Sequence, residues 1–200
     1  VISEWDTYFG RALPRAFARE YCDGPGGCDQ LLRYTYQRGI DGITAGNAPG
    51  SASGPSDRVA EKTKPGPPFD GPGKIRRPTG TGQFDYLHRL AALITAKDRE
   101  LRRKGRGGIE AVAILGSDVY DKLLILRALR DRLPGAVWMT TDLDAHLLHP
   151  AELQWTRNLI VATTYGLRLS EELQGSTPPF RNSYQTSVFL ATRLAADHDK

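Results

Sequence analysis

The polar residues with the clearest potential for chemistry follow three short apolar runs, at 109–115, 136–140 and 158–163. Because ligands bind outside the carboxyl ends of parallel strands, we expect these residues to meet along one edge of a sheet. They combine small hydroxyl side chains with two acidic pairs. The set comprises Gly116, Ser117, Asp118 and Asp121 after the first run, Thr140, Thr141, Asp142 and Asp144 after the second, and Thr163, Thr164 and Tyr165 after the third.

Gly116 and Ser117 lie where a helix is predicted to begin. Free backbone N–H groups at a helix start could hold a carboxylate or a phosphate group. The structural alternative is that Ser117 caps the helix while the charge of Asp118 interacts favourably with the helix dipole. The residue types fit both interpretations, and capping is the more common use of such residues.

Asp142 and Asp144 form an Asp-x-Asp pair after the second run. Two carboxylates with this spacing can share a divalent cation, as in phosphoryl-transfer and nuclease sites. Such a site needs a further acidic residue, which Asp118 or Asp121 could provide. The same pattern is also common in turns, where aspartate side chains bond to the backbone. A metal site at Asp142 and Asp144 is therefore the minor alternative.

Other motifs for catalysis or cofactor binding are weak. His146 and His149 are three residues apart and could join a metal site, but no fourth ligand is evident, so we interpret them as polar residues around the break at Pro150. There is no GxSxG elbow, and GPGKIRRPTG lacks the spacing of a phosphate-binding loop. We therefore expect no catalytic residue and no cofactor.

The three apolar runs alternate with amphipathic helices, which predicts a three-layer α/β/α fold with a mostly parallel sheet. Each run is short and rich in Val, Ile or Trp, as in strands buried on both faces. Helical patterns cover 83–105, 117–133 and 180–197. We assign residues 83–200 to this α/β core.

Residues 1–41 are predicted to form a helical segment that precedes the core. Ser3 is the expected N-cap of its first helix, and Pro14 is expected to kink that helix or divide it. A second short helix is predicted at 28–39. Residues 42–82 are dense in Gly, Pro and Ser, which predicts a long flexible loop or linker.

The charge and hydropathy of the sequence give no sign of nucleic-acid binding or of a membrane-spanning helix. The 27 basic residues exceed the 23 acidic ones, and part of this excess lies in Lys97–Gly108. No nucleic-acid-binding motif accompanies it, so we expect no nucleic-acid partner. No apolar run approaches the roughly 20 residues of a membrane-spanning helix.

The chain opens on Val1 without a signal-peptide pattern, which suggests a piece of a longer protein and leaves a cytoplasmic or periplasmic location open. Cys22 and Cys28 could form a disulfide or remain free thiols.

Three stretches, 111–141, 158–166 and 178–195, together resemble the second half of a type I periplasmic-binding-protein-like domain. Such domains are the ligand-binding parts of ABC-transporter receptors and related sensory receptors. In that family a strand and a helix with small polar residues at their junction precede two further strands. An F-x3-Y segment then leads into a long helix, as Phe180 and Tyr184 do here. A complete domain of the family has two lobes and is longer than this chain.

The resemblance implies a sheet edge that binds a ligand, and a non-enzymatic, sensor- or receptor-like domain of a larger bacterial-type protein. Such a domain binds a small polar molecule or relays a conformational change between lobes. Two other functions remain open: a metal-dependent hydrolase or nuclease that uses Asp142 and Asp144, and a protein-interaction domain. A homodimer and contacts with other domains of the parent chain are also open. The ligand-binding positions implied are Ser117, Asp118, Thr141, Asp142 and Tyr165.

Overall fold

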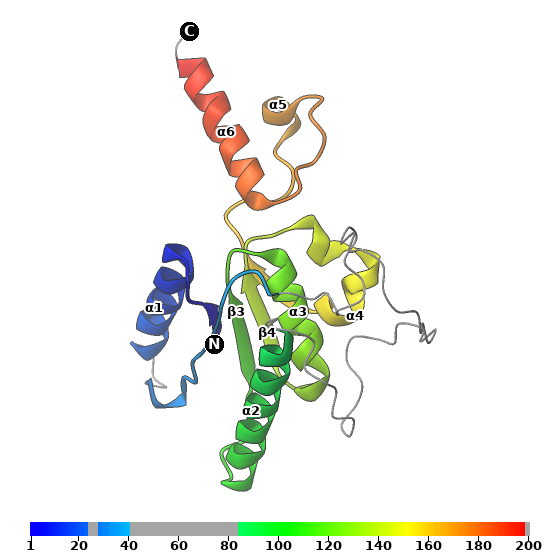
Figure 1. Ribbon diagram of the computed structural model, residues 1–200. Coiled ribbons are helices and arrows are strands. Elements are labelled where there is room, and N and C mark those ends of the chain that lie inside the picture. The colour runs from blue at the N-terminus through cyan, green and yellow to red at the C-terminus, as the bar shows by residue number, and fades with distance from the viewer. Residues whose placement is uncertain (24–27, 41–83, 199–200) are drawn as a thin grey trace, which may run out of the picture.

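A computed structural model describes residues 1–23, 28–40 and 84–198, and a five-stranded parallel sheet lies at its centre (Figure 1). The strand order is β2-β1-β3-β4-β5, and every neighbouring pair is parallel. The predicted α/β class with a parallel sheet is confirmed. The strands are β1 (Ile2–Glu4), β2 (Tyr34–Tyr36), β3 (Ala111–Leu115), β4 (Val137–Thr141) and β5 (Leu159–Ala162).

Helices connect the strands, as the right-handed crossovers of a parallel sheet require. The α-helices are α1 (Tyr8–Cys22), α2 (Phe84–Arg103), α3 (Val119–Leu129), α4 (Leu153–Thr156), α5 (Glu171–Gln174) and α6 (Ser183–His198). Short 3-10 helices are η1 (Cys28–Gln30), η2 (Arg130–Arg132), η3 (Ala145–Leu148) and η4 (Pro150–Glu152). The predicted loop at 42–82 lies outside the described residues. None of the described helices is long and apolar enough to cross a lipid bilayer.

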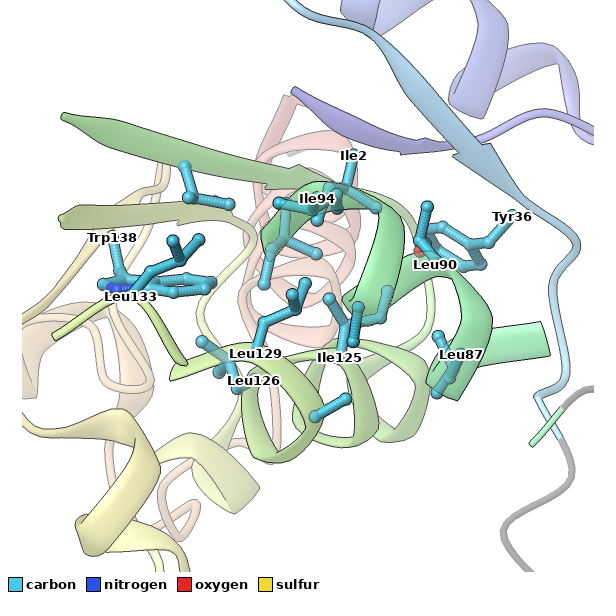
Figure 2. Packing of buried hydrophobic residues seen from close by; sticks show 14 of the residues in the cluster. Ile2, Tyr36, Leu87, Leu90, Ile94, Ile125, Leu126, Leu129, Leu133 and Trp138 are labelled. Carbon is cyan, nitrogen blue, oxygen red and sulfur yellow. The ribbon is translucent and has the colours of Figure 1, made fainter. Parts of the chain in front are cut away.

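The main core lies between the sheet and the helices α2 and α3, while α1 lies on the opposite side of the sheet (Figures 1 and 2). Alternation along the strands explains this arrangement, because successive side chains point to opposite faces. Val112 and Ile114 of β3 belong to the core cluster with Trp138 of β4. Figure 2 shows these strands meeting Leu87, Leu90 and Ile94 of α2 and Ile125, Leu126 and Leu129 of α3.

The first 40 residues contribute two strands to the sheet, so this segment is not helical throughout and forms part of the α/β core. The predicted helix at 28–39 is wrong: η1 and then β2 occupy these positions. Ser3 lies in β1, and the N-cap of α1 is Thr7, whose hydroxyl accepts a hydrogen bond from the Gly10 N–H (2.9 Å). Helix α1 continues through Pro14 as one element, so of the two expected outcomes, a kink or a division, the division is wrong.

The prediction that all three core strands are buried on both faces holds only for β3. In β4 and β5, the residues that face the α1 side are exposed or half-buried, with Val137 and Ile160 each 53% exposed. Helix α1 contacts β1 and β3 but does not extend across β4 and β5. The sheet is thus covered more completely on the side of α2 and α3 than on the side of α1.

A disulfide joins Cys22, the last residue of α1, to Cys28, the first residue of η1. The sequence left this pairing open. Disulfides persist in oxidising compartments and are rare in the cytosol.

Core packing predicts a large difference between two leucines of α2. Leu90 is 4% exposed and Leu93 is 58% exposed. We expect Leu90→Ala to lower the free energy of unfolding by about 2–5 kcal/mol, because it leaves a cavity in the core. The matched control Leu93→Ala should change it by less than about 0.5 kcal/mol. Urea unfolding followed by circular dichroism measures both, and equal losses would contradict this assignment of the core.

The disulfide predicts a moderate contribution to stability. Its cysteines are six positions apart, and closing so short a loop in the unfolded chain is worth about 2 kcal/mol. We expect the double variant Cys22→Ser, Cys28→Ser to lose about that amount in urea unfolding. Reductant should lower the stability of the original chain and leave the double variant unchanged. A chain whose unfolding does not respond to reductant would contradict the bond.

Candidate functional site

The candidate site is the edge of the sheet where the strands end, and we call residues 4–7, 36–40, 116–122, 141–146 and 163–165 the carboxyl edge. The helices that follow the adjacent strands β1 and β3 lie on opposite faces of the sheet (Figure 1). Their loops therefore diverge at this edge, which is the position where open α/β sheets bind ligands.

Glu4 is the central residue between these two loops. It is the last residue of β1 and is fully buried. One carboxylate oxygen accepts hydrogen bonds from the Ser117 backbone N–H (2.8 Å) and from the Ser117 hydroxyl (2.8 Å). The other accepts a hydrogen bond from the hydroxyl of Thr7. The carboxylate thus takes the position that an external anion would occupy.

This arrangement corrects two expectations about Ser117. Its backbone N–H is not free for a ligand, because Glu4 binds it. Its side chain does not cap α3 either. The N-cap is Asp118, whose carboxylate accepts hydrogen bonds from the backbone N–H groups of Tyr120 (2.8 Å) and Asp121 (3.4 Å).

Two glycines allow the close packing around Glu4. A Cβ atom at Gly116 would lie 1.9 Å from the Tyr36 hydroxyl oxygen, and one at Gly10 would lie 2.6 Å from the Glu4 carbonyl oxygen. The Tyr36 hydroxyl is buried and has no hydrogen-bond partner among the described residues. Burial raises its pKa, and the nearby carboxylates of Asp121 and Glu4 raise it further. The hydroxyl therefore stays protonated.

Asp121 supports the site from the first turn of α3 and is not available to a ligand. Its buried carboxylate accepts hydrogen bonds from the backbone N–H groups of Gly39 (2.9 Å) and Ile40 (2.7 Å). Burial raises its pKa above the usual range, although the two backbone hydrogen bonds oppose this. Asp121 therefore attaches the segment after β2 to α3.

Lys122 is a buried cation at the end of β4. Its ammonium donates a hydrogen bond to the Thr141 carbonyl (2.7 Å) and lies 3.8 Å from a carboxylate oxygen of Asp142. Burial lowers its pKa, while the surrounding carboxylates raise it, with Asp142 the strongest of them. Asp142 has a φ of 59°, in the left-handed region, and its N–H donates to the Ala162 carbonyl of β5 (3.0 Å).

Asp142 and Asp144 have different partners and do not share one. One carboxylate oxygen of Asp144 accepts from the backbone N–H of His146 (2.9 Å) and lies 2.7 Å from Nδ1 of its ring, while the other lies 3.9 Å from Nε of Arg181. His149 instead accepts a hydrogen bond from the Ala151 N–H (3.2 Å). No group of three or more metal-binding side chains occurs in the described ranges. The minor alternative of a metal site at Asp142 and Asp144 therefore has no supporting cluster there.

Three buried polar atoms at the carboxyl edge lack a hydrogen-bond partner among the residues described. They are the Tyr36 hydroxyl, the Thr141 hydroxyl and one carboxylate oxygen of Asp142. Buried polar groups in folded proteins are almost always paired, with water or a ligand where the protein supplies nothing. The Asp142 oxygen is the one that lies 3.8 Å from the Lys122 ammonium. A fourth such atom among the described residues, Nη1 of Arg130, lies at the other end of α3, so most but not all of these atoms are at this edge.

The structure places all five predicted ligand-binding residues at this edge. Ser117 and Asp118 follow β3, while Thr141 and Asp142 end the adjacent strand β4, since Ile114 pairs with Thr140. Tyr165 lies beyond the end of β5 and is half-buried. Ser117 and Asp118 are engaged in internal hydrogen bonds, so Thr141 and Asp142 have the larger unused capacity.

Sequence reasoning missed Glu4, Tyr36 and Lys122. Strands β1 and β2 have three residues each, too few for their alternation to be visible. Lys122 did carry a signal, because it interrupts an otherwise apolar helical segment beside Val119 and Leu123. A single charge within a wide apolar helix face indicates a buried, paired cation.

No protein-family model, no characterised protein and no solved structure matches this chain. The resemblance to type I periplasmic-binding-protein-like domains therefore stays a prediction. Functional conclusions rest on the strand order and on the contacts of the carboxyl edge.

The bond between Glu4 and Ser117 predicts a strong energetic coupling. We expect Ser117→Ala to lower the free energy of unfolding by about 1.5–3 kcal/mol, because its hydroxyl donates to a charged group. In a Glu4→Ala background the same change should cost less than about 0.5 kcal/mol. Ser170→Ala is a matched control, because that exposed hydroxyl caps nothing. Urea unfolding of the four variants gives the coupling, and equal losses in both backgrounds would contradict it.

Proposed function

We propose that this chain is a non-enzymatic, receptor-like domain of a larger bacterial-type protein, which binds a small polar molecule at the carboxyl edge. The observation that carries the proposal is the presence along the carboxyl edge of three buried polar atoms without hydrogen-bond partners, one at the end of β2 and two at the end of β4. A ligand or its bound water at the end of β4 would complete the hydrogen bonds of Thr141 and Asp142.

The charge of the edge favours a ligand with a cationic amino group and hydroxyl groups. Asp6 is exposed, and Asp118 and Asp142 are half-buried. Of the nearby cations, Lys122 is buried and paired with Asp142, and Arg181 lies 3.9 Å from Asp144, while Arg38 is exposed. A ligand ammonium would be attracted to these carboxylates, whereas an anion would meet Glu4 already bound to the Ser117 N–H.

The loop after β4 offers a route for relaying ligand binding to α6. Asp144 forms an isolated bridge with Asn182, and the Ser183 N–H donates to the Leu143 carbonyl (2.9 Å). The Ala145 N–H donates to the Arg181 carbonyl (2.8 Å). A ligand that moved Asp142 would therefore also move the backbone to which the start of α6 is bonded. This is the kind of hinge by which receptor domains pass on a signal.

Thermal-shift measurements test the proposal with a panel of amino acids, polyamines, sugars and divalent cations. We expect one amine-bearing compound to raise Tm by about 5–10 °C at a concentration near 100 times its Kd. Asp142→Ala should abolish the shift, because it removes a carboxylate of the edge. Asp131→Ala, which removes an exposed carboxylate of η2 at the other end of α3, should leave the shift unchanged.

Two outcomes would contradict the proposal. Stabilisation by Mg²⁺ or Mn²⁺ alone that disappears in Asp142→Ala would favour a metal-dependent hydrolase. Absence of any response across the panel would favour a protein-interaction domain.

The basic segment Lys97–Gly108 offers fewer unpaired charges to a protein partner than its composition suggested. Both of its lysines pair with Glu100, and Arg102 pairs with Asp98.

A further inference from the structure

The side of the sheet that carries α1 is covered at one end and open at the other. One row of paired residues shows this directly: Ala113 of β3 pairs with Met139 of β4, which pairs with Ile160 of β5. Side chains in such a row point to the same face. Ala113 is 4% exposed, Met139 is half-buried and Ile160 is 53% exposed. Cover therefore decreases from β3 to β5.

The described helices explain this gradient. Helix α1 contacts β1 and β3, whereas α2, η3 and α4 gather around α3 on the opposite side. No described element lies over the outer half of the α1 side. We call the exposed area the open sheet face; its residues are Ala111, Val137, Met139, Ile160 and Ala162.

Helix α6 has an apolar side that nothing covers in the described parts of the chain. Its other side packs against the α5 region, where the rings of Phe180 and Phe189 lie 5.0 Å apart and Arg193 donates to the Leu173 carbonyl (3.0 Å). The exposed side carries residues at intervals of four, three and four, which places them in one line along the helix. This outer stripe consists of Tyr184, Val188, Ala191 and Ala195, with the exposed Leu194 beside it.

The outer stripe is held away from the open sheet face of its own chain. Ser183 and Thr186 tie the start of α6 to the carbonyl groups of Leu143 and Gly166. From there α6 extends beyond the carboxyl edge and away from the sheet (Figure 1). Two exposed apolar surfaces of complementary type, a helix side and a half-covered sheet, thus occur in one chain that holds them apart.

We propose that two copies of this chain form a two-fold dimer by exchanging α6, with the outer stripe of each copy packed on the open sheet face of the other. Helices on both faces are the stable form of a parallel sheet, and each α6 would supply the missing cover. Exchange of an identical element between copies is a common route to dimers and repeats the same contact twice.

The dimensions of α6 suit this contact. It has 16 residues, so it is about 24 Å long and about 10 Å wide, and it spans strands of four or five residues. Two such contacts bury on the order of 1,000 Å² of surface over both copies, which is the lower range for a specific interface. A single contact of this kind buries about half of that area, so two copies joined by one contact should associate more weakly than two copies that exchange both helices.

Sedimentation velocity of the 200-residue chain over a range of concentrations tests the proposal. We expect a species of twice the chain mass of 22.0 kDa. Ile160→Glu on the open sheet face and Val188→Glu on the outer stripe should each reduce it to the monomer. Leu93→Glu is the matched control, because it places the same charge at an exposed leucine on the opposite side of the molecule, and it should remain dimeric.

Mixing the two variants makes the test specific for exchange. In a mixed dimer the intact α6 of the Ile160→Glu copy meets the intact sheet face of the Val188→Glu copy, so one of the two contacts is restored. We expect dimer to reappear on mixing, with weaker association than in the original chain. The proposal is overturned by a chain that stays monomeric, by a variant pair of which only one dissociates, or by two monomeric variants that do not associate when mixed. Circular dichroism of each variant confirms that it is folded.

Discussion

The hydrogen bonds of Glu4 are the constraint on which the rest of the carboxyl edge depends. Strand β1 has three residues and pairs with β3 at two positions only, so the backbone ladder holds these central strands weakly. The buried carboxylate accepts hydrogen bonds from three donors of Ser117 and Thr7, and so binds the loop after β1 to the loop after β3. A buried carboxylate without such partners would be strongly destabilising. With them it positions the first turns of α1 and α3, which lie on opposite faces of the sheet.

Lys122 plays the corresponding part at the end of β4. Its burial lowers its pKa, and it remains a suitable donor because Thr141 and Asp142 provide a carbonyl and a carboxylate. The first turn of α3 thus carries two buried charges, Asp121 and Lys122, which bind the ends of two different strands. The remainder of that helix is apolar and packs in the core. Polar contacts therefore fix the positions of the loops, whereas apolar contacts hold the helices against the sheet.

These two kinds of contact explain how much of the molecule is predictable from its sequence. Strands β3, β4 and β5 and helices α2, α3 and α6 show their apolar patterns locally and are predicted within a few residues. Strands β1 and β2 are too short to show a pattern and depend on pairing with distant strands. The edge itself follows from the general rule for parallel sheets. Which polar atoms of this edge remain available to a ligand does not follow from that rule, because Ser117 and Asp121 bind partners 113 and about 80 positions away.

Strands β4 and β5 show why the prediction of burial on both faces failed. Their sequences, VWMTT and LIVA, are mostly apolar, which is typical of strands buried on both faces. In the structure alternate residues of β4 are buried, whereas the residues of β5 alternate between half-buried and exposed, so part of this apolar composition faces outward. If only one face of these strands were buried, polar residues would be tolerated in place of Val137, Ile160 and Ala162. The outward-facing residues are therefore better explained by a second covering layer than by the fold of the described residues alone. The expectation of two-sided burial was wrong for one copy of the chain, and the exchange of α6 between two copies would satisfy it.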